Sequence, residues 1–360
     1  MTSIVFVGES WGEQEARFQT PFIGSAGQEL SRMLAQAGYG NEALPYNFTS
    51  STRMMGYWDR TDFTLLNVFN EQPKGNNAEN FYAKLQDKVP VNRKLPRRKF
   101  GTSTHYLRDE YSHHVATLHE QLAILKPNVI VALGNTALWA LSLPPSISKL
   151  RGSVVSSKWG KVIPTYHPAM VVRQWSNRTV AVLDLHKALR ESKSPTISSP
   201  ERIIWTEPTI PDLYKWWKDY GSKTSMLAVD IETVKKIQVA EFGIASSPTM
   251  ALHIPFVYKE GGQYISWWKT AEEEMAAWDF VEMVCRSDVP KIGQNVLQYD
   301  SYFMGKALGI PLLNVAQDTM TLAHCWQPEL EKSLGFLGSL FLTEREWKSI
   351  RTHTDKGDDA

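Results

Sequence analysis

The chain has 360 residues, a formal net charge of +1 and a hydrophobic content of 42% that includes 13 tryptophans. This length and apolar content suit two domains of ordinary size with well-filled cores. The chain has no run of 18 apolar residues and opens without a signal-peptide pattern, so we expect neither a membrane-spanning helix nor a secretory leader. Cys285 and Cys325 are too few and too isolated for a disulfide framework or a cysteine-based metal site. Together these features predict a cytoplasmic protein.

Apolar runs alternate with helical patterns in the first half of the chain. The apolar runs are typical of strands buried on both faces, as in a parallel sheet, and the segments between them have helical periodicity. This alternation predicts an α/β sandwich whose functional residues lie at the carboxyl ends of the strands. The expected strands lie at residues 4–8, 63–69, 129–134 and 162–167, and the clearest helices at 27–38 and 114–126.

Six short segments follow one another near these expected strand ends. They are GESWG at 8–12, PFIG at 21–24, NV at 67–68, VALG at 131–134, KLRG at 149–152 and YHP at 166–168. Their order and spacing resemble the family 4 branch of the uracil-DNA glycosylase superfamily. The resemblance implies a three-layer α/β/α domain with a parallel sheet over residues 1–190. It also implies a pocket that receives a base flipped out of DNA.

The resemblance gives three residues a role in that pocket. Phe22 would stack on the flipped uracil, and Asn67 would read its O4 and N3 edge, because an amide offers both a donor and an acceptor. His167 would donate a hydrogen bond to uracil O2 as negative charge develops there. Each residue also has a structural interpretation, in which Phe22 fills the core, Asn67 caps a turn and His167 ends a strand. Taken as an ordered set, they favour a glycosylase-type pocket.

Two further pairs of residues receive roles from the same resemblance. Glu9 or Glu15 would orient water or stabilise the positive charge that develops on the sugar. Met170 and Val171, which come directly after YHP, would wedge into the strand that the flipped base has left.

The chain departs from the family pattern at two places. The family's iron–sulfur cluster needs four cysteines, but the position after NV reads Asn-Glu at 70–71, and no cysteine lies in the first half. We therefore expect no iron–sulfur cluster. Trp11 replaces a proline of the first motif and adds bulk beside the expected pocket.

An enlarged segment at 74–113 contains a basic run, RKLPRRK at 93–99, with five cations in seven residues. A run of this kind is most often a solvated loop. Beside a DNA-acting domain it can also contact phosphates, with Arg97 and Arg98 as the candidate residues. Both interpretations stay open at the level of sequence.

A segment rich in Ser, Pro and charge at 191–201 is typical of a linker. Beyond it, Asp230 and Glu232 stand at the end of an apolar run, and their i, i+2 spacing puts both carboxylates on one face of a strand. Asp300 supplies a third acid, five residues after Asn295. Three such acids suit divalent metal binding, although an isolated D-x-E is usually an ordinary strand end.

The surrounding segments, AVDIET at 228–233, GQNVLQYD at 293–300 and a D-T-M to S-L-G-F-L stretch within 316–341, resemble the 3′–5′ exonuclease domain of family A DNA polymerases, particularly those of bacteriophages. The resemblance implies an RNase H-like mixed sheet flanked by helices, over residues 202–360. It assigns Mg²⁺ or Mn²⁺ binding to Asp230, Glu232 and Asp300, with Asn295 and Tyr299 in support.

The family's third exonuclease motif normally lies beyond the S-L-G-F-L segment, and little chain follows that segment here. His353 and Asp358 have the H-x₄-D spacing of a sister branch, but they lie in a hydrophilic tail. We expect an exonuclease domain cut short before its third motif, with weak or no activity and with its polymerase domain missing.

Three functions are compatible with the sequence. The preferred one is the N-terminal part of a phage family A DNA polymerase that acts on single-stranded or primer–template DNA in a bacterial host. The second is a non-catalytic DNA-binding or replisome-docking module with a degenerate pocket. The third is an active uracil-DNA glycosylase.

Overall fold

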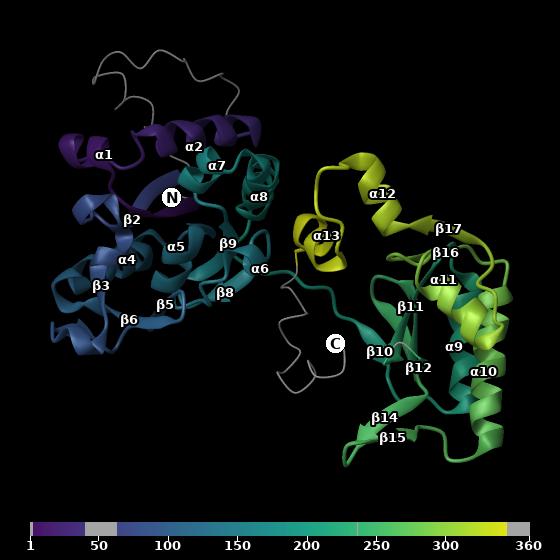
Figure 1. The fold of residues 1–360 in the computed structure, drawn as a ribbon. Helices are drawn as coiled ribbons and strands as arrows, with labels where there is room; N and C mark the ends of the chain where they lie inside the picture. Colours follow the sequence, from purple (N-terminus) through teal and green to yellow (C-terminus); the bar gives the residue numbers. More distant parts are fainter. Residues whose placement is uncertain (1–2, 40–62, 236, 344–360) are drawn as a thin grey trace. The chain divides into compact units, whose positions relative to one another are not determined.

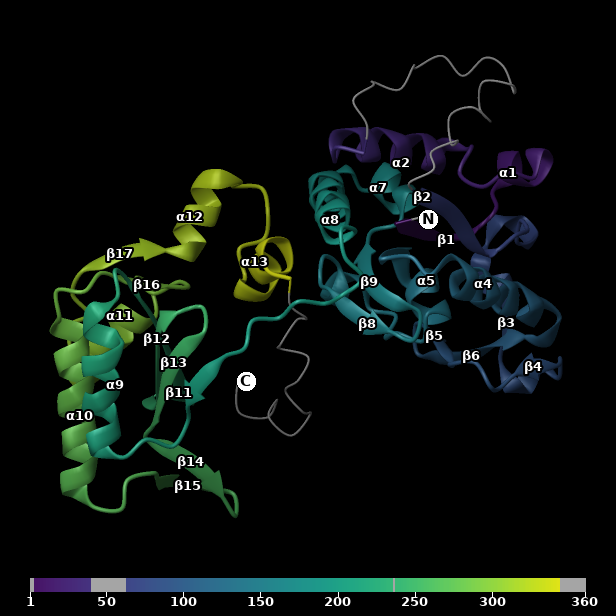
Figure 2. The same ribbon diagram turned by 180° about the vertical axis from the view of Figure 1, so that it is seen from behind.

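The computed structural model of the protein describes residues 3–39, 63–235 and 237–343 (Figures 1 and 2). Contacts divide the chain into two compact units. Unit 1 runs to Ser198 and also includes a stretch that begins at Gly338, whereas unit 2 spans Ser199–Leu337. The division after Ser198 falls within the linker expected from the sequence. The return of the chain to unit 1 at Gly338 has no counterpart in the sequence-based domain boundaries.

A five-stranded sheet forms the centre of unit 1, in the order β2-β1-β7-β9-β8. The first four strands in this order are parallel and coincide with the four apolar runs expected to be strands. The edge strand β8 is antiparallel to β9. The strands are β1 (Ile4–Ser10), β2 (Phe63–Phe69), β7 (Val129–Leu133), β8 (Val155–Ser157) and β9 (Gly160–Thr165).

Helices cover both faces of this sheet, which gives the expected three layers (Figure 1). Alternate residues of β1 point to opposite faces. Val5 and Val7 join the core beneath α4 and α5, while Ile4 and Phe6 join the core beneath α2 and α8. Burial on both faces explains why the strand reads as a continuous apolar run. The helices are α1 (Glu13–Phe18), α2 (Ser25–Gln36), α4 (Ser112–Leu125), α5 (Gly134–Ala140), α6 (Ile147–Leu150), α7 (Pro168–Arg173) and α8 (Arg178–Glu191).

The enlarged segment after β2 folds as a small antiparallel sheet with short 3₁₀ turns. Its central strand is β6 (Ser103–Arg108), which pairs with β3 (Tyr82–Ala83), β4 (Val91–Asn92) and β5 (Arg98–Phe100). The indole of Trp139 on α5 donates a 2.6 Å hydrogen bond to the carbonyl of Pro96. This bond fixes the middle of the basic run to the core of unit 1.

Unit 2 contains the mixed sheet expected of the second half, in the order β10-β13-β12-β11-β16-β17. β12 is antiparallel to both β11 and β13, and the remaining neighbours are parallel. The strands are β10 (Ile203–Trp205), β11 (Leu227–Val234), β12 (Gln238–Ser247), β13 (Met250–Pro255), β16 (Lys291–Gly293) and β17 (Val315–Asp318).

Among the described residues, a hairpin and five α-helices complete unit 2 and its connection back to unit 1. The hairpin pairs β14 (Val257–Glu260) with β15 (Gln263–Ser266). The helices are α9 (Ile210–Asp219), α10 (Ala271–Arg286), α11 (Asp300–Phe303), α12 (Thr319–Trp326) and α13 (Leu334–Phe341). Within the ranges that the structure describes, none of the helices has the length and apolar character needed to cross a membrane.

Candidate active sites

The first candidate site lies at the carboxyl ends of β1 and β2. Gly8 of β1 pairs in register with Asn67 of the parallel β2. The ring of Phe22, from the loop between α1 and α2, reaches the same place, because a Cβ atom at Gly8 would clash with both Asn67 Oδ1 and Phe22 Cζ. The missing side chain at Gly8 therefore lets a buried amide and a buried aromatic ring meet at the strand ends.

Phe22 has an unusual backbone conformation for a bulky residue. Its φ angle of 58° lies in the left-handed region, at a cost of about 1–3 kcal/mol. Such conformations persist where the surroundings hold them, and they cluster at binding sites. The ring also belongs to the core cluster on the α2 side of the sheet, so Phe22 fills part of the core as well.

The two candidate glutamates have different surroundings. Glu15 is 8% exposed, and its Oε1 accepts a 2.8 Å hydrogen bond from the backbone N–H of Gly24. It therefore holds the loop that carries Phe22. The side chain of Glu9 is 34% exposed, and its Oε1 accepts a hydrogen bond from the hydroxyl of Thr136 at the start of α5. Of the two, Glu9 is the carboxylate that a bound molecule can reach.

Arg98, from the basic run, lies beside Glu9. Its Nη2 is 4.0 Å from Glu9 Oε1, and its Nη1 donates a 3.0 Å hydrogen bond to the hydroxyl of Tyr82. The guanidinium also lies over the rings of Tyr82 and Phe100, at 5.2 and 4.8 Å from their centroids. Arg98 is therefore packed inward beside the first site, whereas Arg97 is exposed as a solvated loop residue would be.

His167 lies two residues after the end of β9, at the N-cap of α7. Its Nδ1 accepts a 3.2 Å hydrogen bond from the backbone N–H of Ala169, so the neutral ring carries its proton on Nε2. Burial lowers the pKa of His167, and the nearby Arg173 lowers it further, while Glu9 and Glu15 oppose the shift. The neutral form is therefore favoured at pH 7, with an N–H available as a hydrogen-bond donor.

The tautomer and the pKa of His167 can be measured directly. We expect ¹⁵N NMR of the imidazole to show a neutral Nε2–H tautomer at pH 7 and a pKa below the ordinary 6.5. The physical reason is that burial disfavours the charged ring and Ala169 N–H needs an unprotonated Nδ1. A pKa at or above 6.5, or an Nδ1–H tautomer, would contradict this description.

The two residues expected to form a wedge after YHP differ in exposure. Met170 is partly exposed on α7, as a wedge residue must be. The prediction that Val171 is a wedge residue is wrong, because its side chain is 0% exposed and packs into the core cluster on the α2 side of the sheet. The neighbouring Val172 is 49% exposed. On a helix, consecutive side chains point about 100° apart, so the exposed face passes through Met170 and Val172 but not through Val171.

The second candidate site lies in unit 2, on β11. Asp230 and Glu232 are both exposed on the same face of this strand, as their i, i+2 spacing predicts. Asp300 begins α11, and its Oδ1 accepts a 2.9 Å hydrogen bond from the backbone N–H of Ile231. The three expected acids are therefore brought to one stretch of β11.

Burial of Asp300 raises its pKa to about 6. The hydrogen bond from Ile231 N–H works against this shift, and the negative charges of Asp318 and Glu232 add to it. The effect of Glu232 on Asp300 shows that the two carboxylates are close enough to interact.

Asp318, at the N-cap of α12, is a buried acid to which the sequence analysis assigned no role. Its Oδ1 accepts hydrogen bonds from the backbone N–H of Asn295 at 3.0 Å and of Met320 at 2.9 Å, and its Oδ2 accepts one from Leu297 at 3.2 Å. Asn295 has a φ of 58°, a left-handed conformation that asparagine tolerates better than most residues. Asp318 thus fixes the turn that leads into Asp300.

Tyr299 ties the same segment to β11. Its hydroxyl and that of Thr233 form a 2.7 Å hydrogen bond. Asn295 and Tyr299 therefore lie in the segment that leads into Asp300, which these two contacts hold against β11 and Asp318.

The carboxylates have the oxygen donors that Mg²⁺ and Mn²⁺ take in proteins. In the part of the chain that the structure describes, however, no three His, Cys, Asp or Glu side chains are grouped as ligands of one ion. Asp300 Oδ1 is already engaged by Ile231 N–H. The donor chemistry fits a divalent metal, but this arrangement of the side chains does not. His353 and Asp358 lie outside the described residues.

A pocket of about 600 Å³ opens beside Glu232. Part of its wall comes from the β14–β15 hairpin, which contributes Tyr258 and Tyr264 and is followed by Trp267. The ammonium of Lys259 lies 5.6 Å from the ring centroid of Tyr264. Aromatic rings with an adjacent cation are the usual platform for unpaired nucleotides.

Comparison with known proteins identifies the first unit. The model of the uracil DNA glycosylase superfamily matches residues 1–189. The type-4 uracil-DNA glycosylase of Thermotoga maritima is 31% identical over 192 residues, which cover 52% of this chain and 76% of that protein. The type-4 uracil-DNA glycosylase of Archaeoglobus fulgidus is 30% identical over 206 residues, which cover 54% of this chain and 80% of that protein.

A third relative is a DNA polymerase of Bacillus phage SP01. It is 26% identical over 133 residues, which cover 35% of this chain and 14% of the polymerase. The match to the glycosylase model covers more than half of the chain and coincides with the parallel sheet of unit 1. The chain therefore belongs to the uracil-DNA glycosylase superfamily.

Proposed function

We propose that unit 1 is a DNA glycosylase that removes uracil from DNA. One observation carries the proposal: Phe22 and Asn67 meet at Gly8, and a neutral His167 follows β9 of the same sheet by two residues. A ring to stack on, an amide to read a base edge and a neutral N–H donor are the three features that recognition of a flipped uracil needs. The similarity to two type-4 uracil-DNA glycosylases supports the same function.

The chemistry assigns each residue a distinct task. Breaking the bond between C1′ and uracil N1 leaves its electron pair on the base, so negative charge grows on O2 and positive charge on the sugar. The Nε2–H of His167 would donate to O2 and stabilise that negative charge. Glu9, oriented by the hydroxyl of Thr136, would stabilise the sugar cation and direct the water that adds to C1′. The water then loses one proton to solvent, and uracil gains one.

Outside the pocket, DNA binding would use exposed residues of unit 1. Met170 and Val172 on α7 can enter the space that the flipped base leaves in the strand. Arg97 is exposed in the basic run and is available to a phosphate. Arg98, which packs beside Glu9, would act within the site instead.

A cleavage assay tests this proposal. The full chain is incubated with labelled single-stranded DNA that contains one uracil, and alkali then breaks the strand at each abasic site. We expect one alkali-dependent product at the uracil position and none with thymine or cytosine in its place. Absence of any product at micromolar protein would favour the alternative, a DNA-binding or docking module without catalysis.

We further infer that unit 2 is an exonuclease-type domain of a replication protein, with primer–template or single-stranded DNA and a polymerase module as partners. The specific observation is that Asp230, Glu232 and Asp300 all lie at β11 or against it, with Glu232 lining an aromatic pocket. The similarity of the chain to a phage DNA polymerase is compatible with a replication protein.

We expect this chain to have weak or no 3′–5′ exonuclease activity by itself, because its described acids are not grouped as ligands of one metal ion. A 5′-labelled primer is incubated with the chain and Mg²⁺, or with Mn²⁺, and shortening is followed on a gel. The Asp230→Ala variant serves as the matched control for contaminating nuclease. Robust shortening by the wild-type chain that disappears in Asp230→Ala would overturn the expectation.

A further inference from the structure

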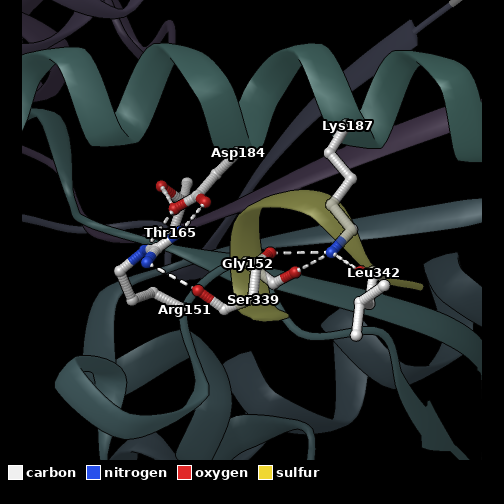
Figure 3. Close-up of polar contacts among 7 residues, drawn as sticks. All are labelled: Arg151, Gly152, Thr165, Asp184, Lys187, Ser339 and Leu342. Carbon is white, nitrogen blue, oxygen red and sulfur yellow. Dashed lines mark hydrogen bonds and ion pairs between the residues drawn. The ribbon is translucent and has the colours of Figure 1, made fainter. Parts of the chain in front are cut away.

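A buried ionic network lies under the last turn of α13, where the chain has returned to unit 1 (Figure 3). Arg151, from the KLRG segment, pairs with Asp184 of α8, and their side chains are 3% and 1% exposed. Arg151 Nε lies 2.9 Å from Asp184 Oδ2, and Arg151 Nη2 bonds Asp184 Oδ1. Asp184 Oδ2 also accepts a 2.9 Å hydrogen bond from the hydroxyl of Thr165, at the end of β9.

The segment 338–342, which we call the clasp, completes this network. Arg151 Nη1 donates a 2.9 Å hydrogen bond to the hydroxyl of Ser339. The ammonium of Lys187 on α8 donates to the carbonyls of Gly152 at 2.6 Å, of Ser339 at 2.7 Å and of Leu342. The three N–H donors of this buried ammonium therefore meet three carbonyls, two of which belong to the clasp.

Gly152 allows the clasp to approach this closely. Its φ is +71°, in the region that disfavours side chains, and a Cβ atom there would lie 2.8 Å from the carbonyl oxygen of Ser339 and 2.7 Å from Asp184 Oδ1. The two last residues of the KLRG segment, Arg151 and Gly152, thus share one role in seating the clasp. Without the clasp, two buried cations would lose hydrogen-bond acceptors, a loss that burial makes costly.

The network ends next to the candidate glycosylase histidine. Thr165 is bound by Asp184, and the carbonyl of Pro164 accepts a 2.9 Å hydrogen bond from Gly152 N–H. These contacts hold the last two residues of β9, which lie three and two positions before His167. A continuous set of buried hydrogen bonds therefore runs from Ser339 to the strand that presents His167.

We propose that the clasp is a positioning element for His167, so that a segment lying after unit 2 in the sequence sets the geometry of the site in unit 1. Any effect of the clasp on base excision depends on the proposed glycosylase function. The positioning itself does not depend on that function, because His167 can be observed without any substrate.

The test uses the full chain with Lys187→Met, which removes all three ammonium hydrogen bonds but keeps an apolar stem. Arg190→Met is the matched control, because Arg190 is an exposed cation on the same helix. Hydrogen exchange reports whether residues 338–343 are held, and ¹⁵N NMR of the imidazole reports the tautomer and pKa of His167. Ser339→Ala, which removes one hydroxyl, provides a milder variant.

With Lys187→Met we expect exchange in the clasp to become at least about tenfold faster and the pKa of His167 to rise toward its ordinary value as the strand end loosens. Ser339→Ala should shift the same resonances by less, and Arg190→Met should leave both readouts at their wild-type values. Faster clasp exchange with an unchanged His167 would overturn the positioning role. If hydrogen exchange in the clasp is unchanged in both variants, the hydrogen bonds of Lys187 and Arg151 do not hold the clasp in place. If Lys187→Met does not fold, the comparison of Ser339→Ala with wild type decides.

Discussion

Replacing His167 by alanine is expected to slow uracil excision by about two to three orders of magnitude, the usual loss when a donor to a developing negative charge is removed, and we expect a loss of similar size for Asn67→Ala because base recognition is lost. His167→Ala removes the Nε2–H that faces uracil O2 in the proposed mechanism. Asn67→Ala removes the amide that both accepts from and donates to the base edge. Single-turnover rates on single-stranded DNA with one uracil measure both losses.

A histidine elsewhere in unit 1 provides the control for this comparison. His186 is exposed on α8, and its Nδ1 is 3.2 Å from the carbonyl of Ala37. His186→Ala should therefore keep a rate close to that of the wild-type chain. If the rates of Asn67→Ala and His167→Ala lie within about threefold of the His186→Ala rate, neither Asn67 nor His167 takes part in excision.

Gly8→Ala is expected to abolish most excision while the fold persists. The added methyl group would overlap Asn67 Oδ1 and Phe22 Cζ, so the amide, the ring or both must move out of the place where they meet. Overpacking of this kind costs about 1–3 kcal/mol of stability, which a domain of ordinary stability can absorb. Circular dichroism and thermal unfolding check the fold, and the uracil assay gives the rate.

Gly305→Ala is the matched substitution for this experiment. An added Cβ at Gly305 meets no atom within 4 Å. Its excision rate should equal that of the wild-type chain. If Gly8→Ala keeps the wild-type rate as well, the meeting of Phe22 and Asn67 at Gly8 is not the base-binding site.

Several features of unit 1 are predictable from sequence because their cause is local. The runs 4–8 and 129–134 are apolar throughout and the runs 63–69 and 162–167 are mostly apolar, because each strand contributes side chains to the cores on both faces of the sheet. The polar residues that follow them collect at one edge, because parallel strands end on the same side of a sheet. Asn67 and His167 can be placed at that edge on this reasoning alone.

Other features depend on contacts that sequence spacing does not encode. Val171 was expected to be exposed, but the rotation of α7 is fixed by the N-cap at His167 and turns Val171 into the core. Arg98 sits in a run that suits a solvated loop, yet it faces inward because Trp139 holds the backbone at Pro96.

Long-range contacts account for the remaining differences. Asp318 is distant in sequence from Asn295, from whose backbone N–H it accepts a hydrogen bond. Ser339 contacts Arg151 across 188 residues, with unit 2 lying between them in the sequence. The D-T-M motif contains Asp318 but does not indicate its contact with Asn295, and no local pattern marks the end of α13 as part of unit 1.

The most direct test of the proposed function is to identify the base that the full chain releases. Single-stranded DNA containing uracil, and matched strands containing thymine or cytosine, are incubated with the chain, and free bases are quantified by mass spectrometry. We expect uracil to be released, in an amount equal to the abasic sites formed, and no release from the other two strands. Failure to release uracil by a chain that still binds the same DNA would contradict the account.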